Sequence, residues 1–126
     1  MSVSSSPDGL ITVAREVRGQ AVIVRVAGEV DFSSLVHLQD ELSAAVADAA
    51  PPGPVVLDLE EVGFFGWCGL TLLVNQDDRC TRSHTPLRVV ATTGTVLQPL
   101  RLAGLGEVLP VYPDVASALA EEAPVG

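Results

Sequence analysis

The chain has 126 residues, of which 48% are hydrophobic, and its seven basic side chains stand against 16 acidic ones, giving a net charge of −9. This length predicts one domain with a buried core, and no apolar run approaches the ~20 residues that span a bilayer. Because clustered Lys and Arg are missing, we expect the protein to bind neither nucleic acids nor anionic membranes. The missing bilayer-spanning run and the polar first residues predict a cytoplasmic protein.

The first residues, MSVSSSPD, are polar and contain no basic side chain, so they do not resemble a signal peptide. We predict that residues 1–9 form a disordered lead-in and that residues 10–122 form the domain. Residues 123–126 are predicted to be a frayed tail.

Two strands and a helix are predicted for the first part of the domain. Leu10 to Val17 alternates apolar and polar residues, and Ala21 to Val26 is a second apolar run after the turn at 18–20, which predicts a β-hairpin. From Phe32 onward, apolar residues recur three and four positions apart, which predicts a helix to Ala50. The proline-rich residues 51–54 end it.

The middle of the chain combines a strand, a glycine turn and a helix. Val55 to Leu59 is an apolar run typical of a buried parallel strand. Val62 to Leu70 has the pattern of a short buried strand, a tight turn and the start of a helix that continues from Gly69 to about Ser83, with Val74 facing the sheet. Ligands and partners usually dock at such a junction in open α/β sheets.

The rest of the chain continues the alternation of strands and helices. We predict a strand at Leu87–Ala91, a loop at 92–95, a short helix at Val96–Leu102, a strand at Val108–Tyr112 and a helix at Val115–Glu122. The order β-β-α-β-α-β-α-β-α predicts the α/β class: a single domain with a mixed, mainly parallel sheet of roughly four to five strands and about four helices.

Four places along the chain share their pattern with one family. They are Gly28–Asp31, Val56–Leu59, Phe65–Leu70, and Leu102–Leu105 together with Leu109–Tyr112. All four occur in order at sensible spacing, and in them the chain resembles the STAS domains, the fold of bacterial anti-sigma factor antagonists. The resemblance covers the chain from about Leu10 to Ala120 and implies a STAS-like domain.

The resemblance gives the turn at residues 66–69 a regulatory meaning. The family pattern is Asp-Ser-Ser-Gly, and a partner kinase phosphorylates the serine before the glycine; this chain has Gly66, Trp67, Cys68 and Gly69. Cys68 thus stands at the phosphoserine position. Gly66 replaces the aspartate, and its missing Cβ would allow a positive φ. A phosphate would add about −1.5 to −2 charge to a docking face, but cysteine is a poor substrate for a serine kinase, so we expect this switch to be missing.

The resemblance also implies a partner-binding face at one end of the sheet. Its members would be Asp31, Gly66, Trp67, Cys68, Gly69, Thr92 and Thr93. Asp31 would contact the partner, cap the first helix, or do both. Trp67 would either be an exposed interface anchor or fold back over the sheet edge. Thr92 and Thr93 would contact a partner or a phosphate group, or form only a polar connection.

The cysteines and histidines indicate neither a disulfide nor a metal site. Cys68 and Cys80 lie twelve positions apart on one predicted helix, which is roughly 18 Å and too far for a disulfide. His37 and His84 have no ligand-like spacing to them, and no catalytic motif is present, so we expect no enzyme, cofactor or metal. Cys68 is either a small packing residue or, at a helix start, a reactive thiol.

These observations predict a regulator that resembles an anti-sigma factor antagonist. It would bind an anti-sigma factor of the serine-kinase-like ATPase type, free a sigma factor, and escape control by serine phosphorylation. A variant of this hypothesis has the chain associating with itself or with other STAS proteins. The alternative hypothesis is a sensor module of STAS fold for a small molecule or nucleotide, or for thiol redox state. The acidic surface would either attract a basic partner or only keep the protein dissolved.

Overall fold

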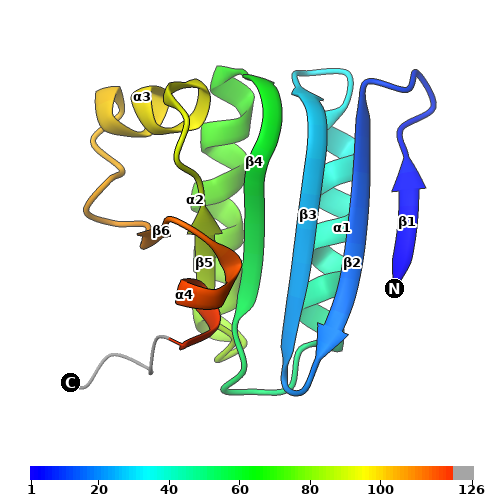
Figure 1. Cartoon of the computed structure of the whole chain (residues 1–126), viewed down its shortest axis with the longest axis vertical. Helices are drawn as coiled ribbons and strands as arrows, with labels where there is room; N and C mark the ends of the chain where they lie inside the picture. Colours follow the sequence, from blue (N-terminus) through cyan, green and yellow to red (C-terminus); the bar gives the residue numbers. More distant parts are fainter. Residues whose placement is uncertain (121–126) are drawn as a thin grey trace.

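A six-stranded sheet forms the centre of the structure, a computed structural model that describes residues 1–120 (Figure 1). The strands lie side by side in chain order: β1 (Ser2–Ser5), β2 (Ile11–Arg18), β3 (Ala21–Val30), β4 (Val55–Phe65), β5 (Leu87–Val90) and β6 (Val111–Tyr112). The pairs β1–β2 and β2–β3 are antiparallel, and the pairs from β3 to β6 are parallel. The predicted α/β class and mixed, mainly parallel sheet are confirmed, with β1 added at one edge.

Helices lie on both faces of this sheet. The described helices are α1 (Leu35–Asp48), α2 (Trp67–Arg82), α3 (Gly94–Leu102) and α4 (Val115–Ala120). Helices α1 and α2 cover one face, and the short α4 lies on the other (Figure 1). Helix α3 lies at the end of the sheet where β4 ends (Figure 1). The predicted end of the last helix, residues 121–122, and the predicted tail, residues 123–126, lie outside the described residues.

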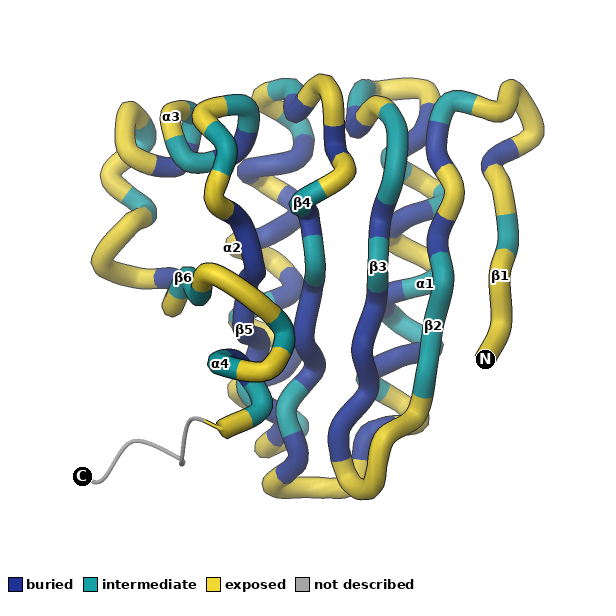
Figure 2. Tube along the Cα trace, in the orientation of Figure 1, coloured by how far each residue is buried: buried dark blue, intermediate teal, exposed yellow. Residues whose placement is uncertain are grey.

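The paired strands β3 and β4 form the centre of the core. Val22, Ile23 and Val24 pair with residues 55–57, and all six side chains are fully buried (Figure 2). Both faces of these strands are apolar because α1 and α2 cover one and α4 covers part of the other. The smaller cluster under α4 consists of Ile23, Val56, Val90 and Ala118.

Residues 1–9 differ from their prediction as a disordered lead-in, because Ser2–Ser5 forms β1 and pairs with β2. The Ser4 hydroxyl donates to Glu41 Oε1 at 2.8 Å and lies 2.9 Å from His37 Nε2, both on α1. This segment is polar, and it is held by backbone bonds and hydroxyl contacts rather than by burial. An apolar pattern therefore could not reveal it.

Two side chains expected in the core face solvent instead. Phe32 was assigned to the apolar stripe of the first helix, but α1 begins only at Leu35, and Phe32 is 84% exposed. Val74 was expected to face the sheet and is 43% exposed, whereas Leu72 and Leu73 beside it are buried. Because Phe32 and Val74 are exposed, the helix-covered side of the molecule has more apolar surface than the sequence predicted.

Strand β4 is longer than expected and joins the two predicted strands at Val55 and Val62 into one. Its pairing with β3 shifts register after Arg25 and again after Gly28, so β4 carries an extra residue at each shift. Such bulges bend a strand and increase its twist. Because β5 pairs with β4 only as far as Asp58, the last part of β4 extends past β5 and contacts α3.

No helix among residues 1–120 is both long enough and apolar enough to cross a membrane.

Gly28 should be essential for the β2–β3 pairing. Its φ is +109°, and a Cβ there would lie 2.1 Å from the carbonyl oxygen of Leu10, which already accepts a hydrogen bond from the Glu29 N–H at 2.9 Å. We predict that Gly28→Ala lowers the free energy of unfolding by about 2 kcal/mol or more, as measured by urea denaturation. The control is Gly94→Ala, where a Cβ meets nothing within 4 Å. Equal stability of the two variants would contradict the role assigned to Gly28.

Candidate functional site

One backbone hydrogen bond joins the ends of β3 and β4. The Gly66 N–H donates to the Val30 carbonyl at 2.9 Å, where Val30 also pairs with Phe65. The loop that follows β3 and the first turn of α2 are therefore held next to each other. The sequence prediction that Asp31 and the glycine turn lie at the same end of the sheet is confirmed by this bond.

Asp31 organises the loop before α1. Its Oδ1 accepts hydrogen bonds from the N–H groups of Ser33, at 2.9 Å, and Ser34, at 3.1 Å, and from the Ser33 hydroxyl at 2.8 Å. The hydrogen bond from Ser33 is the main reason that the pKa of Asp31 lies below its ordinary value of 3.8. Ser34 is fully buried, and its hydroxyl donates to the Glu29 carbonyl at 2.7 Å. Asp31 therefore stabilises the turn at residues 31–34 before α1. The prediction that it caps the helix itself is wrong, because the N-cap of α1 is Ser34 and no side chain caps that helix.

Two aromatic side chains project from the joined loops. Trp67, the first residue of α2, is 72% exposed, so it does not fold back over the sheet edge. Phe32 is 84% exposed and was not predicted as a site residue, because its spacing from the later apolar residues matched a helix stripe. The signal that could have identified it is its position directly after Asp31.

Trp67 lies between two shallow hollows. The first, of about 400 Å³, lies between α1 and α2 and is lined by Phe32, Leu35, Gln39, Trp67, Cys68, Thr71, Leu72 and Asn75. The second, of about 220 Å³, is lined by Trp67, Leu70, Thr71, Val74, Ala103 and Leu105. We call the residues that line these two hollows the Trp67 surface. Most of its lining side chains are apolar, and Trp67 and Thr71 belong to both hollows.

The two glycines of the turn have different roles. Gly66 precedes α2 with a φ of −77°, so the expectation of a positive φ there is wrong. Gly69 is buried in the first turn of α2, and a Cβ there would lie 2.8 Å from Cζ of the Phe65 ring. Gly69 allows the helix to pack directly on Phe65, which positions Trp67 and Cys68 at the surface.

The two cysteines are free and lie in different environments. Cys68 is partly exposed and lines the first hollow, at the position that the resemblance gives to the phosphoserine. Cys80 is 1% exposed, and burial raises the pKa of its thiol to about 11. Both cysteines lie on α2, as the sequence predicted.

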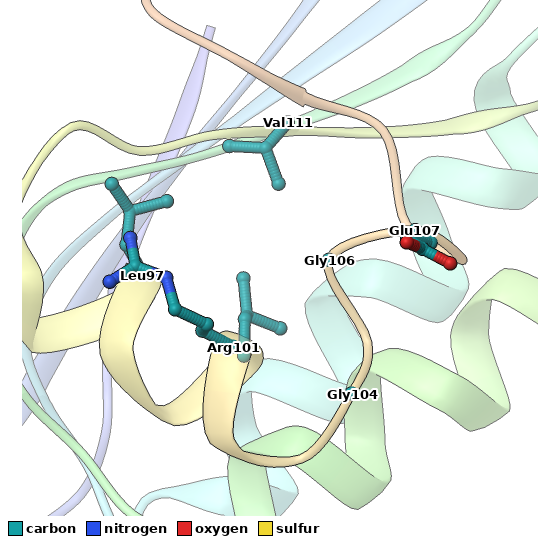
Figure 3. A pocket seen from close by; sticks show the side chains of 7 residues that line it. Leu97, Arg101, Gly104, Gly106, Glu107 and Val111 are labelled. Carbon is teal, nitrogen blue, oxygen red and sulfur yellow. The ribbon is translucent and has the colours of Figure 1, made fainter.

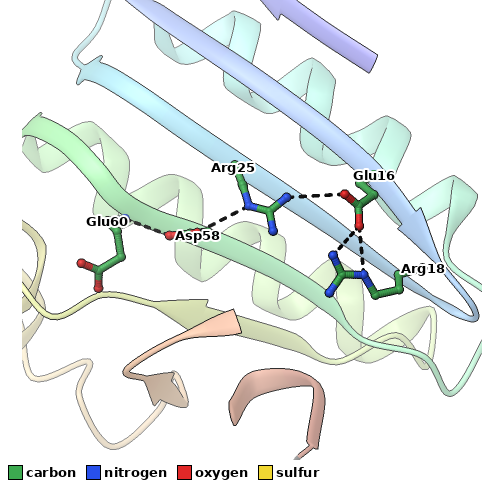
Figure 4. Close-up of polar contacts among 5 residues, drawn as sticks. All are labelled: Glu16, Arg18, Arg25, Asp58 and Glu60. Carbon is green, nitrogen blue, oxygen red and sulfur yellow. Dashed lines mark hydrogen bonds and ion pairs between the residues drawn. The ribbon is translucent and has the colours of Figure 1, made fainter. Parts of the chain in front are cut away.

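Thr92 and Thr93 are separated from the Trp67 surface. The Thr92 hydroxyl donates to Glu60 Oε2 at 2.8 Å, and Glu60 lies with Asp58 and Arg25 on the sheet face opposite α1 and α2 (Figure 4). Thr93 directly precedes α3, and its hydroxyl is buried with no hydrogen-bond partner in the described part of the chain. Neither threonine lines either hollow.

Charged side chains pair across the sheet face that bears Glu60. Arg25 lies 3.6 Å from Glu16 and 3.9 Å from Asp58 (Figure 4). A second arginine, Arg18, contacts Glu16 at 2.5 Å, and its hydrogen bond is the main cause of the lowered pKa of Glu16. Asp58 therefore has a structural role in these ion pairs. Across residues 1–120, no group of three or more His, Cys, Asp or Glu side chains could hold a metal ion.

Comparison with known proteins identifies one family. The family model of the STAS domain matches residues 12–118. The anti-sigma-F factor antagonist RsfA of Mycobacterium tuberculosis is 34% identical over 99 residues, which cover 79% of this chain and 77% of RsfA. A solved structure, that of an anti-sigma factor antagonist from Mycobacterium paratuberculosis, superposes with a TM-score of 0.79 at 32% identity and covers 94% of this chain and 100% of that one.

A more distant structure shares the fold. The anti-sigma factor antagonist SpoIIAA, a cell fate determinant of Bacillus, has been solved in its unphosphorylated and phosphorylated forms. These superpose with TM-scores of 0.69 and 0.64 at 17% and 16% identity. The unphosphorylated form is matched over 84% of this chain and 92% of its own length, and the phosphorylated form over 84% and 96%.

The two thiols should react at different rates in the folded protein. At neutral pH the pKa of about 11 keeps Cys80 protonated, and its 1% exposure blocks access. We predict that a thiol reagent labels one cysteine per chain in the native state and two in guanidinium chloride. Cys68→Ser should leave no native labelling, whereas Cys80→Ser should leave it unchanged. Labelling of Cys80 in the folded protein, located by mass spectrometry, would contradict the burial described above.

Proposed function

The chain belongs to the STAS domain family, and on that premise we propose that it acts as an anti-sigma factor antagonist. It would bind an anti-sigma factor of the kinase type and thereby free a sigma factor for transcription. Support comes from RsfA and from the Mycobacterium paratuberculosis structure, both above 30% identity and both named for this activity. These names describe regulators rather than enzymes, and we propose binding without catalysis, in the cytoplasm.

The observation that carries this proposal is the Trp67 surface. A tryptophan that is 72% exposed has a large apolar area that a partner would bury on binding. Tryptophan is also among the residues that most often dominate interface energies. Phe32 extends the apolar area on the α1 side, and Val74 and Leu105 extend it toward α3. The surface therefore offers a projecting anchor flanked by hollows that a partner's side chains would fill.

Charge on this chain complements a partner with a basic docking face. The chain carries a net charge of −9, and the residues lining the two hollows include no Lys or Arg. Asp31 stands beside Phe32 with a carboxylate held in the ionised form by its hydrogen bonds. We propose that the anti-sigma factor provides an apolar pocket for Trp67 and basic side chains around it.

Loss of the acceptor serine makes this surface insensitive to the kinase activity of such a partner. Cys68 occupies the second position of α2, and the helix start has no side-chain cap. A phosphate at this position would place a doubly charged group inside the first hollow, between Trp67 and Phe32. We propose that phosphorylation never closes the apolar surface, so that capture of the anti-sigma factor does not depend on the activity of the kinase.

Removal of the Trp67 side chain should weaken capture of the anti-sigma factor strongly. We predict that Trp67→Ala lowers the affinity by roughly 30-fold or more, corresponding to about 2 kcal/mol, because a central interface tryptophan would be lost. Phe32→Ala should lower it by a smaller factor. The measurement is isothermal titration of the purified chain into a kinase-type anti-sigma factor from the same genome.

The matched control is Val17→Ala, which removes an exposed apolar side chain on β2, away from the Trp67 surface. Its affinity should equal that of the unmodified chain. If Trp67→Ala and Val17→Ala bound equally well with unchanged folds by circular dichroism, the Trp67 surface would not be the docking site. Binding to another STAS chain in place of an anti-sigma factor would overturn the proposed partner.

The kinase should not modify this chain. We predict that incubation with the anti-sigma factor and ATP leaves its intact mass unchanged, because position 68 carries no hydroxyl. Cys68→Ser, which restores the hydroxyl, should acquire one phosphate and lose affinity. Detection of phosphate on the unmodified chain at Cys68, Ser33 or Thr71 would show that a switch has been retained.

A further inference from the structure

A further hollow lies beside α3, outside the Trp67 surface. It has a volume of about 510 Å³ and is bounded by α3, β6 and the loop at residues 103–107 (Figure 3). Its apolar walls are Leu97 and Leu100 on α3 and Val111 on β6. This volume lies within the ~300–1,000 Å³ typical of small-molecule pockets.

One cation borders this cavity. The side chain of Arg101 extends from the last turn of α3 along the wall that Leu97 forms (Figure 3). Within residues 1–120, Arg101 makes no ion pair or side-chain hydrogen bond, whereas the arginines at 15, 18, 25, 79, 82 and 88 all make at least one. Its guanidinium group therefore has its full set of donors available beside an apolar cavity.

We propose that this cavity binds a small monocarboxylic acid with an apolar body. A guanidinium group binds carboxylates through two parallel hydrogen bonds, and Leu97, Leu100 and Val111 would cover the apolar part of the ligand. Glu107 lies on the opposite side of the cavity, on the loop (Figure 3). Its negative charge disfavours a ligand with a second anionic group, which argues against dicarboxylates and phosphate esters.

Two glycines of the loop, Gly104 and Gly106, line the cavity. Gly104 has a φ of +72°, and a Cβ added at Gly104 or Gly106 would meet nothing within 4 Å. Gly106 does not adopt a positive φ, so it tolerates a side chain without backbone strain. A large apolar residue at position 106 would therefore occupy free space at the cavity wall and provides a direct test.

The same loop forms a wall of the Trp67 surface. Ala103 and Leu105 line the second hollow beside Trp67, whereas Gly104 and Gly106 line the cavity. A bound acid would contact the loop from one side while the docking partner contacts it from the other. This consequence rests on the proposed function: ligand binding would change the affinity of the Trp67 surface and would provide a signal in place of phosphorylation.

The test uses octanoate as the probe and the full chain labelled with ¹⁵N. We expect saturable shifts of the amide signals of Leu97, Arg101, Gly104 and Gly106 on titration. Octanamide has the same body without the charge and should bind about tenfold more weakly or worse, and octylamine should not bind. Equal affinities of octanoate and octanamide, shifts centred elsewhere, or no saturation would overturn the proposal.

Two variants test the site itself. Arg101→Gln should lower octanoate affinity about tenfold and abolish the preference over octanamide, whereas Arg82→Gln, the same change on α2, should leave both unchanged. Gly106→Leu should block both probes. If Gly106→Leu fails to fold, Arg101→Gln still decides, because unaltered octanoate binding in that variant would contradict the assignment of Arg101.

A separate measurement tests the coupling. Affinity for the anti-sigma factor is compared with and without saturating octanoate, in the unmodified chain and in Arg101→Gln. A shift of threefold or more that disappears in the variant supports coupling through the loop, and an unchanged affinity overturns it. Because the octanoate titration needs no partner, failure of the proposed function and failure of the cavity assignment give different results.

Discussion

The hydrogen bond from the Gly66 N–H to the Val30 carbonyl is the constraint on which the site depends. It joins the end of β3 to the end of β4, and therefore fixes where the loop before α1 and the first turn of α2 lie. On the β3 side, Asp31 and Ser34 hold the loop in a turn, so that Phe32 faces solvent instead of joining α1. On the β4 side, the missing Cβ of Gly69 allows α2 to pack on Phe65. Trp67 is exposed as a consequence of both.

The length of β4 makes this bond geometrically available. Two register shifts insert extra β4 residues opposite β3, and β4 extends past the last residue that pairs with β5. The extension places the start of α2 beyond the end of β5, next to α3 and the loop that contains Ala103 and Leu105. The second hollow therefore depends on the register of β4 against β3. A β4 that ended where β5 ends would leave Trp67 without Ala103 and Leu105 as neighbours.

The apolar pattern predicted most of the fold, because buried strands and helix stripes are encoded by side chains. The run from Ala21 was predicted as a hairpin strand and the run from Val55 as a buried parallel strand, and both are strands of the central sheet. The family resemblance placed the turn at Gly66 correctly. Features held by the backbone or by polar groups could not be predicted in this way. β1 is joined through backbone pairing and Ser4 hydroxyl contacts, and the bulges of β4 leave no compositional trace.

Only part of the candidate site was predicted, because the apolar pattern does not report the polar contacts that shape the loops. The family resemblance identified Asp31 and Trp67, and the structure places them in joined loops. Phe32 was misassigned because a residue three positions before a helix stripe matches the stripe, and only the turn contacts of Asp31 distinguish the two cases. Thr92 was grouped with the site because it follows a parallel strand. β5 is too short to carry it there, and its hydroxyl contacts Glu60 on the opposite sheet face.

Cys68 stands at the position that the family resemblance gives to an acceptor serine, beside the exposed Trp67. On the proposed function, two physical effects contribute to recognition of the partner, and they act at different ranges. In the proposed complex, burial of Trp67 and Phe32 would depend little on ionic strength and would set the lifetime of the complex. The net charge of −9 acts at longer range and sets how fast a basic partner arrives, an effect that salt screens. A phosphoserine switch acts on the lifetime by placing charge within the apolar contact. Without a hydroxyl at position 68, control of the lifetime requires a change in the shape of the apolar contact itself. Leu105 and Ala103 form the wall of the second hollow that is not part of α2, so the loop that bears them is the element through which such a change would act.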